Sequence, residues 1–356
     1  MIWFFLLSGL FLGWSLGAND ASNIFGTAVA TRMVRFKTAA LIGGVGVIVG
    51  AVVSGSGTAD TLHSLGAVDA VAGAFTVALA AAVSVAAMNR MGLPVSTSQT
   101  VVGAIIGWNF FVGASTDAKV LTKILSAWAL SPLLAAAIAI ALYLVAQRAV
   151  RRWEIHLLDL DALTRLGLLV TGAFGAYSLG ANNVGNVMGV FASANPFDDI
   201  PLFGNTSFTG MQQLFLIGGI AIAVGIYTGS YRVMMTVGNQ IFKLTPLLAL
   251  VVVLSHSLVL FLFASTTVRD LLSWLGMPTF PLVPVSSTQA VIGAIIGLAM
   301  YKGGGSGVQV ETLGKVAVGW VVAPIAAGLI SFVALFFVQN VFQLEVVSTL
   351  SAAAGR

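Results

Sequence analysis

The stretch SLGANDASNIFG at residues 15–26 decides how this chain is organised, because it returns as SLGANNVGNVMG at residues 178–189 with seven of twelve positions identical. A second pair of motifs follows in the same order. PVSTSQTVVGAIIG at residues 94–107 returns as PVSSTQAVIGAIIG at residues 284–297, with ten of fourteen positions identical. Two motifs that recur in the same order indicate an internal duplication.

Composition places the chain in a membrane. Of its 356 residues 58% are hydrophobic and only 8% are charged, and the mean hydropathy is +1.01, which excludes an ordinary soluble domain. The sequence has no cysteine, so it offers neither a disulfide framework nor a thiolate metal site. The cations behind the net charge of +4 lie in short loops, a pattern that indicates membrane orientation and no nucleic-acid partner.

Apolar runs predict the membrane crossings. Because a spanning helix needs roughly 20 mostly apolar residues, the chain has room for about ten. Six runs predict continuous helices at residues 38–56, 70–89, 121–147, 210–229, 245–265 and 312–340. Four more are interrupted by Gly, Asn, Pro, Ser or Thr, which predicts broken or re-entrant helices at residues 2–31, 91–114, 165–194 and 271–301.

The duplication divides the chain into a first repeat at residues 1–150, an amphipathic interfacial connector at residues 151–163 and a second repeat at residues 164–356. Each repeat makes about five crossings, an odd number, so the second enters the membrane from the opposite side. We therefore expect an all-α polytopic membrane protein built from two inverted repeats, with broken half-helices meeting at the midplane. Secondary transporters hold substrate and coupling ions between such repeats.

The first motif pair carries amide and carboxylate groups. In GANDASN we expect the helix to unwind near Gly17, which would free carbonyl oxygens for a cation and N–H groups for an anion. Asp20 is the carboxylate placed deep within an apolar stretch. Such a residue is costly in lipid without a partner, so a bound cation is the expected partner, although a structural hydrogen bond remains the alternative.

The second motif pair carries hydroxyls at the start of helices. Pro94 and Pro284 fit at the beginning of a new helix, with the following Ser and Thr in capping and first-turn positions. A helix N-terminus surrounded by hydroxyls and an amide is a neutral cradle for an anion. Two such ends that face each other can surround a tetrahedral oxyanion. Small and hydroxyl residues also serve helix packing, which is the alternative for both motif pairs.

At these motifs the chain resembles the inorganic phosphate transporter family, whose signature is a duplicated GAND-type sequence with Ser/Thr-rich PVSST-type motifs. The resemblance covers nearly the whole chain. It implies sodium- or proton-coupled symport of inorganic phosphate across the cell membrane, through an inverted-repeat fold in contact with lipid and often as a homodimer. The phosphate shell that it implies is Asp20, Asn183, Ser96, Thr97, Ser98, Ser286, Ser287 and Thr288, and the sodium shell is Asn19, Asp20, Asn23, Asn182, Asn186, Gln99 and Gln289.

The chain departs from the family pattern in two places. Asn183 stands where the family commonly has Asp, so one repeat supplies an amide in place of a carboxylate. The long hydrophilic central loop of many members is absent. Family relatives that carry sulfate look less like GAND at the first motif.

Several functions compete with a sodium-coupled phosphate symporter that works by alternating access. The nearest is a proton-coupled phosphate permease, or a permease for sulfate or another oxyanion, with the same fold. An anion channel would favour cationic rings, and an enzyme would need a nucleophile beside a base; the motifs contain neither, so we expect no enzyme. Sodium is preferred over protons because buried titratable groups are scarce. The three histidines, His63, His156 and His256, have no metal-ligand spacing and are interpreted as loop or interhelical residues.

Overall fold

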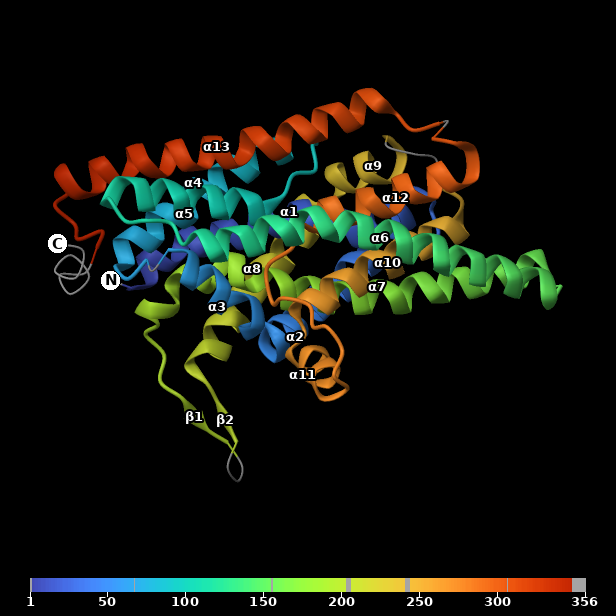
Figure 1. Cartoon of the computed structure of the whole chain (residues 1–356), viewed down its shortest axis with the longest axis horizontal. Coiled ribbons are helices and arrows are strands. Elements are labelled where there is room, and N and C mark those ends of the chain that lie inside the picture. The colour runs from blue at the N-terminus through green and yellow to red at the C-terminus, as the bar shows by residue number, and fades with distance from the viewer. Residues whose placement is uncertain are drawn as a thin grey trace.

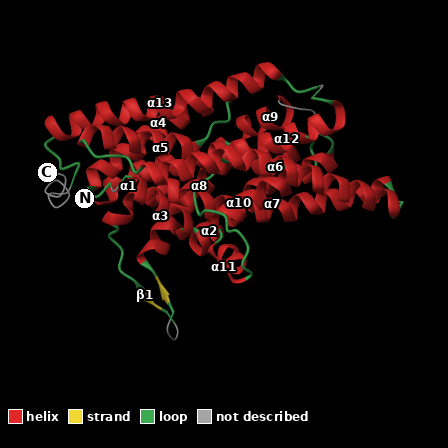
Figure 2. Ribbon diagram, in the orientation of Figure 1, coloured by secondary structure: helices red, strands yellow, loops and turns green. Residues whose placement is uncertain are grey.

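Nearly all of the chain is helical (Figure 2), as expected. The structure is a computed structural model that describes residues 2–66, 68–154, 156–202, 206–240, 244–305 and 307–347. Among them the only strands are β1 (Ile200–Pro201) and β2 (Ser207–Phe208), which pair antiparallel with Ile200 opposite Phe208. This ribbon projects from one side of the helical body (Figure 1).

The helices fall into two series that follow the two repeats. The first series is α1 (Ile2–Ala30), α2 (Phe36–Ser54), α3 (Ser56–Leu65), α4 (Val71–Arg90), α5 (Thr97–Val112) and α6 (Ala118–Arg152). The second is α7 (Leu157–Met188), the 3-10 helix η1 (Gly189–Ala194), α8 (Gly210–Gly229), α9 (Tyr231–Gln240), α10 (Pro246–Ala264), α11 (Thr266–Trp274), α12 (Ser287–Gly303) and α13 (Val310–Asn340).

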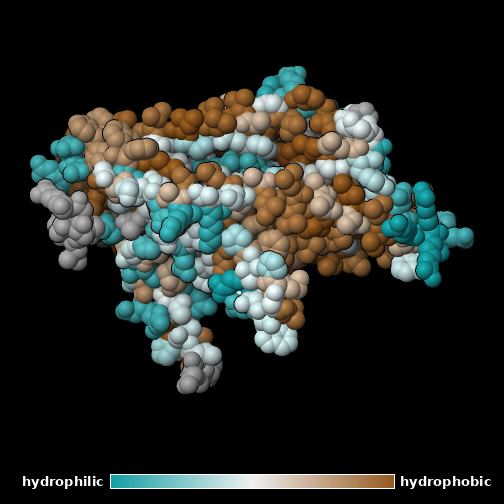
Figure 3. Space-filling view, viewed as in Figure 1, coloured by the Kyte–Doolittle hydropathy of each residue, from teal (hydrophilic) through white to brown (hydrophobic). Residues whose placement is uncertain are grey.

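Seven helices of the described residues are long and apolar enough to cross a membrane, namely α1, α2, α4, α6, α8, α10 and α13. The half-helices α5 and α12 are shorter, with 16 and 17 residues. The outer face of α13 is apolar and exposed at Val321, Ile325 and Leu329, and it forms a brown band along the molecule in Figure 3. The chain is therefore a multi-pass membrane protein.

The predicted breaks occur in one motif pair and not in the other. Extended segments precede α5 and α12, as expected for residues 91–114 and 271–301. The break expected within residues 2–31 is wrong, because α1 is one regular helix through Gly17 and Asp20. The break expected within residues 165–194 is also wrong at the motif, since α7 stays helical to Met188.

Close helix contacts explain why glycines stand in these motifs without breaking the helices. A Cβ on Gly17 would lie 2.0 Å from the carbonyl oxygen of Ile222 in α8, and one on Gly180 would lie 2.1 Å from that of Val47 in α2. Gly17 and Gly180 occupy equivalent positions in the two motifs. Each glycine therefore lets its helix pack against the other repeat, and the backbone carbonyls stay in the helix ladder.

The segment expected to be an amphipathic interfacial connector, residues 151–163, spans the junction of α6 and α7. α6 ends at Arg152 and α7 begins at Leu157, and Trp153 and Glu154 form a turn directly after α6. His156 caps α7, its Nδ1 accepting from the backbone N–H of Leu158 at 3.4 Å. Figure 3 shows the tip made by the ends of α6 and α7 as hydrophilic.

Each repeat packs its elements against the other repeat. α1 packs on α8 while α7 packs on α2, and α5 packs on α13 while α12 packs on α6. In Figure 1, α6 runs toward the α6–α7 turn, whereas α13 runs from that side back toward the end where α1 begins. Equivalent elements thus make equivalent contacts, and the motif-bearing segments lie at the centre of the molecule.

Candidate functional site

Both half-helices begin at the predicted serines. The Ser96 hydroxyl accepts the backbone N–H of Gln99 at 3.3 Å, and the Ser286 hydroxyl accepts that of Gln289 at 3.2 Å. A hydroxyl at this position satisfies one of the free N–H groups of a helix start. The expectation that each hydroxyl motif begins a helix is confirmed.

An asparagine of each first motif fixes the extended segment in front of each half-helix. Asn19 donates from Nδ2 to the Val95 carbonyl at 2.8 Å and accepts the Val95 N–H at 3.2 Å. Asn182 makes the same two bonds to Val285, at 3.0 and 3.3 Å. Each side chain thus replaces the backbone partner that the extended residue lacks. We call these two pairs the asparagine locks.

Hydroxyls of the half-helices cross between the repeats. Thr288 donates to the Val95 carbonyl at 2.7 Å, and Ser98 donates to the Val285 carbonyl at 3.2 Å. Ser98 and Thr288 are equivalent positions of the repeated motif. The N-termini of α5 and α12 therefore meet at the centre, as the sequence predicts.

A second asparagine of each first motif bonds to these hydroxyls. Asn23 Nδ2 lies 2.9 Å from Ser287 Oγ and 3.3 Å from Thr288 Oγ1. The equivalent Asn186 donates to Ser98 Oγ at 2.9 Å. All four motifs, far apart in the sequence, therefore belong to one polar cluster.

The two repeats differ at one position of this cluster. Asp20 accepts from the amide of its neighbour Asn19. Asn183, its counterpart, accepts on Oδ1 from Asn186 at 2.9 Å and from Ser98 at 3.5 Å. These contacts orient the Asn183 amide so that its Nδ2 has no partner among the described residues.

Several other polar atoms of these motifs are buried and have no partner within the described part of the chain. They are Asn23 Oδ1, Asn186 Oδ1, Gln99 Oε1, Gln289 Oε1 and Thr97 Oγ1. The four amide oxygens form two equivalent pairs, one oxygen of each pair from each repeat. Because buried polar atoms are usually hydrogen-bonded, this uncommitted set fits a site that a ligand completes. Amide oxygens are suitable ligands for a hard cation, whereas an amide N–H and a hydroxyl suit an anion.

A model of the phosphate transporter family matches residues 16–269 and 268–353 of the chain, which include both copies of both motifs apart from Ser15. The chain belongs to the phosphate transporter family. Its place is therefore among transporters and not among enzymes.

Individual relatives cover nearly the whole of this transporter. A protein of Methanocaldococcus jannaschii that bears the name phosphate permease is 29% identical over 328 residues, which are 92% of this chain and 95% of that protein. The sulfate permease CysP of Bacillus subtilis is 29% identical over 362 residues, 98% of this chain and 92% of CysP. A solved structure described as "The sodium-dependent phosphate transporter" matches with a TM-score of 0.72 at 22% identity, over 96% of this chain and 99% of that one, so the two share a fold.

Most of the predicted site residues are buried in this structure. Asp20 is 2% exposed, Thr97 is 2% exposed and Asn183 is fully buried. Gln99 is also buried, and Gln289 is half-buried.

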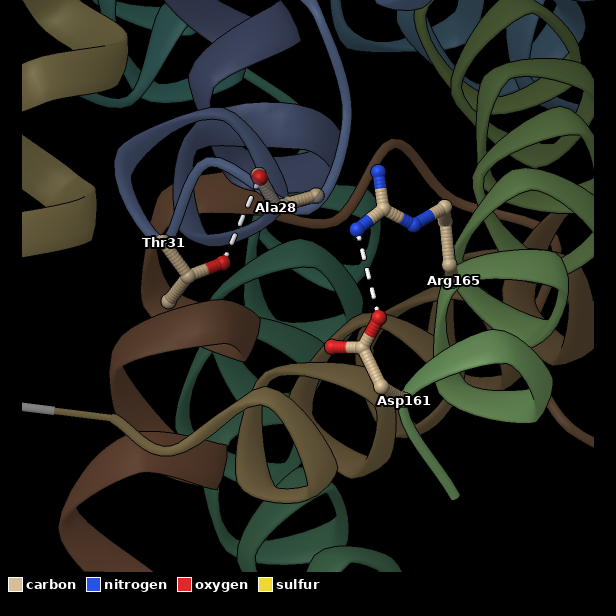
Figure 4. A network of polar contacts seen from close by, with 4 residues as sticks. All are labelled: Ala28, Thr31, Asp161 and Arg165. Atoms are coloured by element: carbon tan, nitrogen blue, oxygen red, sulfur yellow. Dashed lines mark hydrogen bonds and ion pairs between the residues drawn. The ribbon is translucent and has the colours of Figure 1, made fainter. Parts of the chain in front are cut away.

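The ion pairs of the described residues lie outside the site. Figure 4 shows Arg165 reaching Asp161 one turn earlier on α7, at 3.2 Å, and Thr31 bonding back to the Ala28 carbonyl at the end of α1. The Arg165 and Asp161 side chains are about half exposed. The described motifs themselves hold no Arg or Lys, so an anion in this site would meet neutral donors.

The structure gathers the predicted residues and adds one that the sequence interpretation set aside. His256 on α10 is fully buried, and its Nε2 lies 2.8 Å from Ser287 Oγ. The signal was available, because an ionisable residue within an apolar spanning run is a functional candidate by default. The search for metal-ligand spacing missed it because its partner is a hydroxyl of another helix.

Proposed function

We propose that this protein is a sodium-coupled symporter of inorganic phosphate that works by alternating access in a cell membrane. The observation that carries the proposal is the convergence of two equivalent helix N-termini on buried atoms that have no partner among the described residues. Membership of the phosphate transporter family supports the substrate. The shared fold with a solved sodium-dependent phosphate transporter supports the coupling ion.

Phosphate would bind between α5 and α12. The Thr97 hydroxyl and the Asn183 amide N–H are free to donate, and Ser98, Ser287 and Thr288 lie beside them with Ser96 and Ser286 at the helix starts. A neutral cradle at helix N-termini holds an anion without the slow release that an arginine clamp would impose. Asp20 would contact the phosphate through its protonated oxygen or through the shared cation.

Sodium would bind to side-chain oxygens, since the regular helices α1 and α7 leave no unwound carbonyls there. Asp20, Asn23 and Gln99 offer oxygens in the first repeat, and Asn186 and Gln289 offer them in the second. Asn19 and Asn182 were predicted in the same shell. Their oxygens accept the backbone N–H groups of Val95 and Val285, so any sodium contact would use the second lone pair.

Alternating access would use the pairing of the repeats. We propose that the two repeats are inverted, which the opposite directions of α6 and α13 in Figure 1 support. Rocking of one repeat against the other would then open the site to either side in turn. The division at residues 1–150 and 164–356, the plasma-membrane location and the homodimer belong to the same proposal.

Sulfate is the second candidate substrate. The similarity to a sulfate permease extends over 98% of this chain. In addition, Asn183 offers a donor where the family commonly offers a carboxylate, and sulfate at neutral pH has only acceptor oxygens. A site rich in donors favours it, whereas a carboxylate that accepts from a protonated phosphate oxygen rejects it.

Uptake into proteoliposomes tests the proposal. The purified protein would be given radiolabelled phosphate under an inward sodium gradient or an inward proton gradient, each with and without excess sulfate. We expect sodium-driven uptake that resists sulfate. Uptake driven only by the proton gradient would show that protons, and not sodium, are the coupling ion. Competition by sulfate would favour sulfate as the substrate. No phosphate flux under either gradient would contradict the proposed function.

A further inference from the structure

A third repeated pattern lies in the spanning helices α6 and α13. α6 contains WALSP at residues 128–132 and α13 contains WVVAP at residues 320–324, so each helix has a tryptophan four residues before a proline. Residues four apart lie on the same face of a helix. Each helix therefore presents its tryptophan and its proline to the same neighbour.

The neighbours are the two half-helices, and the two contacts are equivalent. A Cβ on Gly293 of α12 would clash with the Pro132 carbonyl oxygen of α6, and one on Gly103 of α5 would clash with the Pro324 carbonyl oxygen of α13. Gly103 and Gly293 occupy equivalent positions of the repeated motif. α6 therefore packs on α12 in the same register as α13 packs on α5, and the contact of one tryptophan predicts the contact of the other.

The two tryptophans do not make the same hydrogen bond. Trp128 donates from Nε1 to the Pro284 carbonyl oxygen, directly before α12, at 3.2 Å. The carbonyl that the repeat assigns to Trp320 is that of Pro94, before α5. Trp320 Nε1 is buried and has no partner among the described residues. One of two equivalent bonds is therefore made, and the other is not.

α13 does reach the segment that contains Pro94. A Cβ on Gly319, the residue before Trp320, would lie 3.1 Å from Cγ1 of Val95, the residue after Pro94. Buried N–H groups are nearly always hydrogen-bonded, because an unmade bond leaves the group without the water it had when exposed. The Trp320 N–H is therefore costly in this arrangement, and a shift of α13 against the segment would satisfy it.

The residues in front of the two prolines differ in the same sense. Leu93 and Val283 are equivalent, and each donates its backbone N–H to a carbonyl near the end of the preceding helix, α4 or α10. Val283, which precedes the bonded Pro284, is fully buried. Leu93, which precedes Pro94, is half-buried. The segment that a tryptophan holds is therefore the more protected of the two.

We propose that Trp128 and Trp320 are positioning residues that alternate: in each access state one of them donates to the proline carbonyl before the other repeat's half-helix, and the other is released. In this structure Trp128 holds the segment before α12. In the opposite state Trp320 holds the segment before α5 through Pro94, and Pro284 separates from α6. The inference rests on the proposed function, because it takes the two repeats to exchange their arrangements during alternating access.

The exchange of one bond for its equivalent makes the two substitutions act in opposite directions. Replacing a tryptophan by phenylalanine keeps an aromatic ring and removes the N–H. Trp128→Phe therefore destabilises the state seen here, and Trp320→Phe destabilises the opposite state. A change that affects one of two states shifts the population toward the other.

A single cysteine can report on this population, because the chain has no cysteine of its own. Val283→Cys places the thiol in the buried residue before Pro284, which lies outside the predicted phosphate and sodium shells. A buried thiol reacts only when its segment opens, so its rate of reaction with N-ethylmaleimide in detergent-purified protein measures how often the segment before α12 is released.

In the Val283→Cys protein we expect Trp128→Phe to raise the labelling rate by about fivefold and Trp320→Phe to lower it by about fivefold, the effect of one hydrogen bond of ordinary strength. The variant that carries both should return close to the rate of the parent protein, since the two effects oppose each other. Trp153→Phe is the matched control, because Trp153 lies directly after α6 and is 70% exposed. It should leave the rate unchanged.

The outcomes separate the inference from the proposed function. Labelling rates that stay constant, or that rise in both variants as loosened packing alone would cause, would overturn the inference, and phosphate uptake by the wild type would leave the symporter intact. Absence of phosphate uptake by the wild type would overturn both. If Trp128→Phe fails to fold, as gel filtration in detergent would reveal, Trp320→Phe decides: a lower rate supports the inference, and an unchanged or higher rate overturns it.

Discussion

The two repeats use the same framework and different chemistry. Asn19 locks Val95 as Asn182 locks Val285, with four bonds between 2.8 and 3.3 Å. One residue further along, the repeats diverge: Asp20 is a carboxylate and Asn183 is an amide. The shared contacts build the half-helix starts, so they define the fold. The divergent position determines the charge of the site, and it is there that the coupling chemistry should be sought.

The largest effect is expected from disrupting the close helix packing that the two repeats share. Gly17→Ala and Gly180→Ala would each place a Cβ near 2 Å from a backbone carbonyl of the other repeat, at 2.0 and 2.1 Å. Backbone atoms cannot move aside cheaply, so we expect loss of folded protein in both variants. Gel filtration in detergent would measure it. Gly314→Ala on α13, where nothing lies within 4 Å, should behave as the wild type, and a folded Gly17→Ala protein would contradict the packing argument.

The second-largest effect is expected from removing the difference in charge between the two repeats. Asp20→Asn makes the first motif as neutral as the second, and we expect sodium-driven uptake to fall by about ten- to a hundredfold, since bonds to a charged group contribute about 1.5–3 kcal/mol. Initial rates against sodium concentration would measure it. Asp161→Asn, which removes an exposed carboxylate on α7, is the control. Wild-type uptake by Asp20→Asn would remove Asp20 from the coupling site.

The opposite substitution gives both repeats a carboxylate. Asn183→Asp replaces a free donor with a second negative charge, so we expect the apparent KM for phosphate to rise by about thirtyfold at low sodium, because one lost donor and added repulsion each contribute about 1 kcal/mol. High sodium should restore part of the affinity by neutralising the new charge. A phosphate KM that stays constant across sodium concentrations would contradict the role of Asn183 in the anion cradle.

The smallest effect tests the equivalence of the asparagine locks. Asn19→Ala and Asn182→Ala each remove the two hydrogen bonds to the extended segment, about 2 kcal/mol together, and should lower the melting temperature by a few degrees. The fall should be somewhat larger for Asn19→Ala, because Asn19 also donates to Asp20. Asn340→Ala, which removes one bond from exposed α13, should change it little. A clearly larger fall for Asn182→Ala would contradict the equivalence of the two asparagine locks.

Much of the architecture could be predicted from the sequence, because the two pairs of repeated motifs indicate the duplication. The hydroxyl motifs predict the helix starts at Ser96 and Ser286, since proline followed by serine has few other local solutions. The expected unwinding at Gly17 is wrong because a glycine in a helix has two explanations. A break and a close helix contact look alike until the opposing carbonyl of Ile222 is known.

The sequence predicted which side chains meet in the polar cluster, and it did not predict their hydrogen-bond partners. The repetition identified the asparagines and hydroxyls. The partner of Asn19 is the backbone of Val95, and because every residue has a backbone carbonyl, such a partner cannot be recognised from the type of residue. The contact of His256 could not be predicted from the sequence either. Its partner lies on another helix, and spacing along the chain does not encode that contact.

The most direct test of the central claim measures whether sodium and phosphate bind together. Calorimetric titration of the purified wild type with phosphate, at low and at high sodium, should show that sodium raises phosphate affinity, and titration with sodium should show the same factor in return, as linkage requires. The account predicts that Asp20→Asn loses this coupling while it stays folded. Phosphate affinity that does not depend on sodium in the wild type, or coupling that persists in Asp20→Asn, would contradict it.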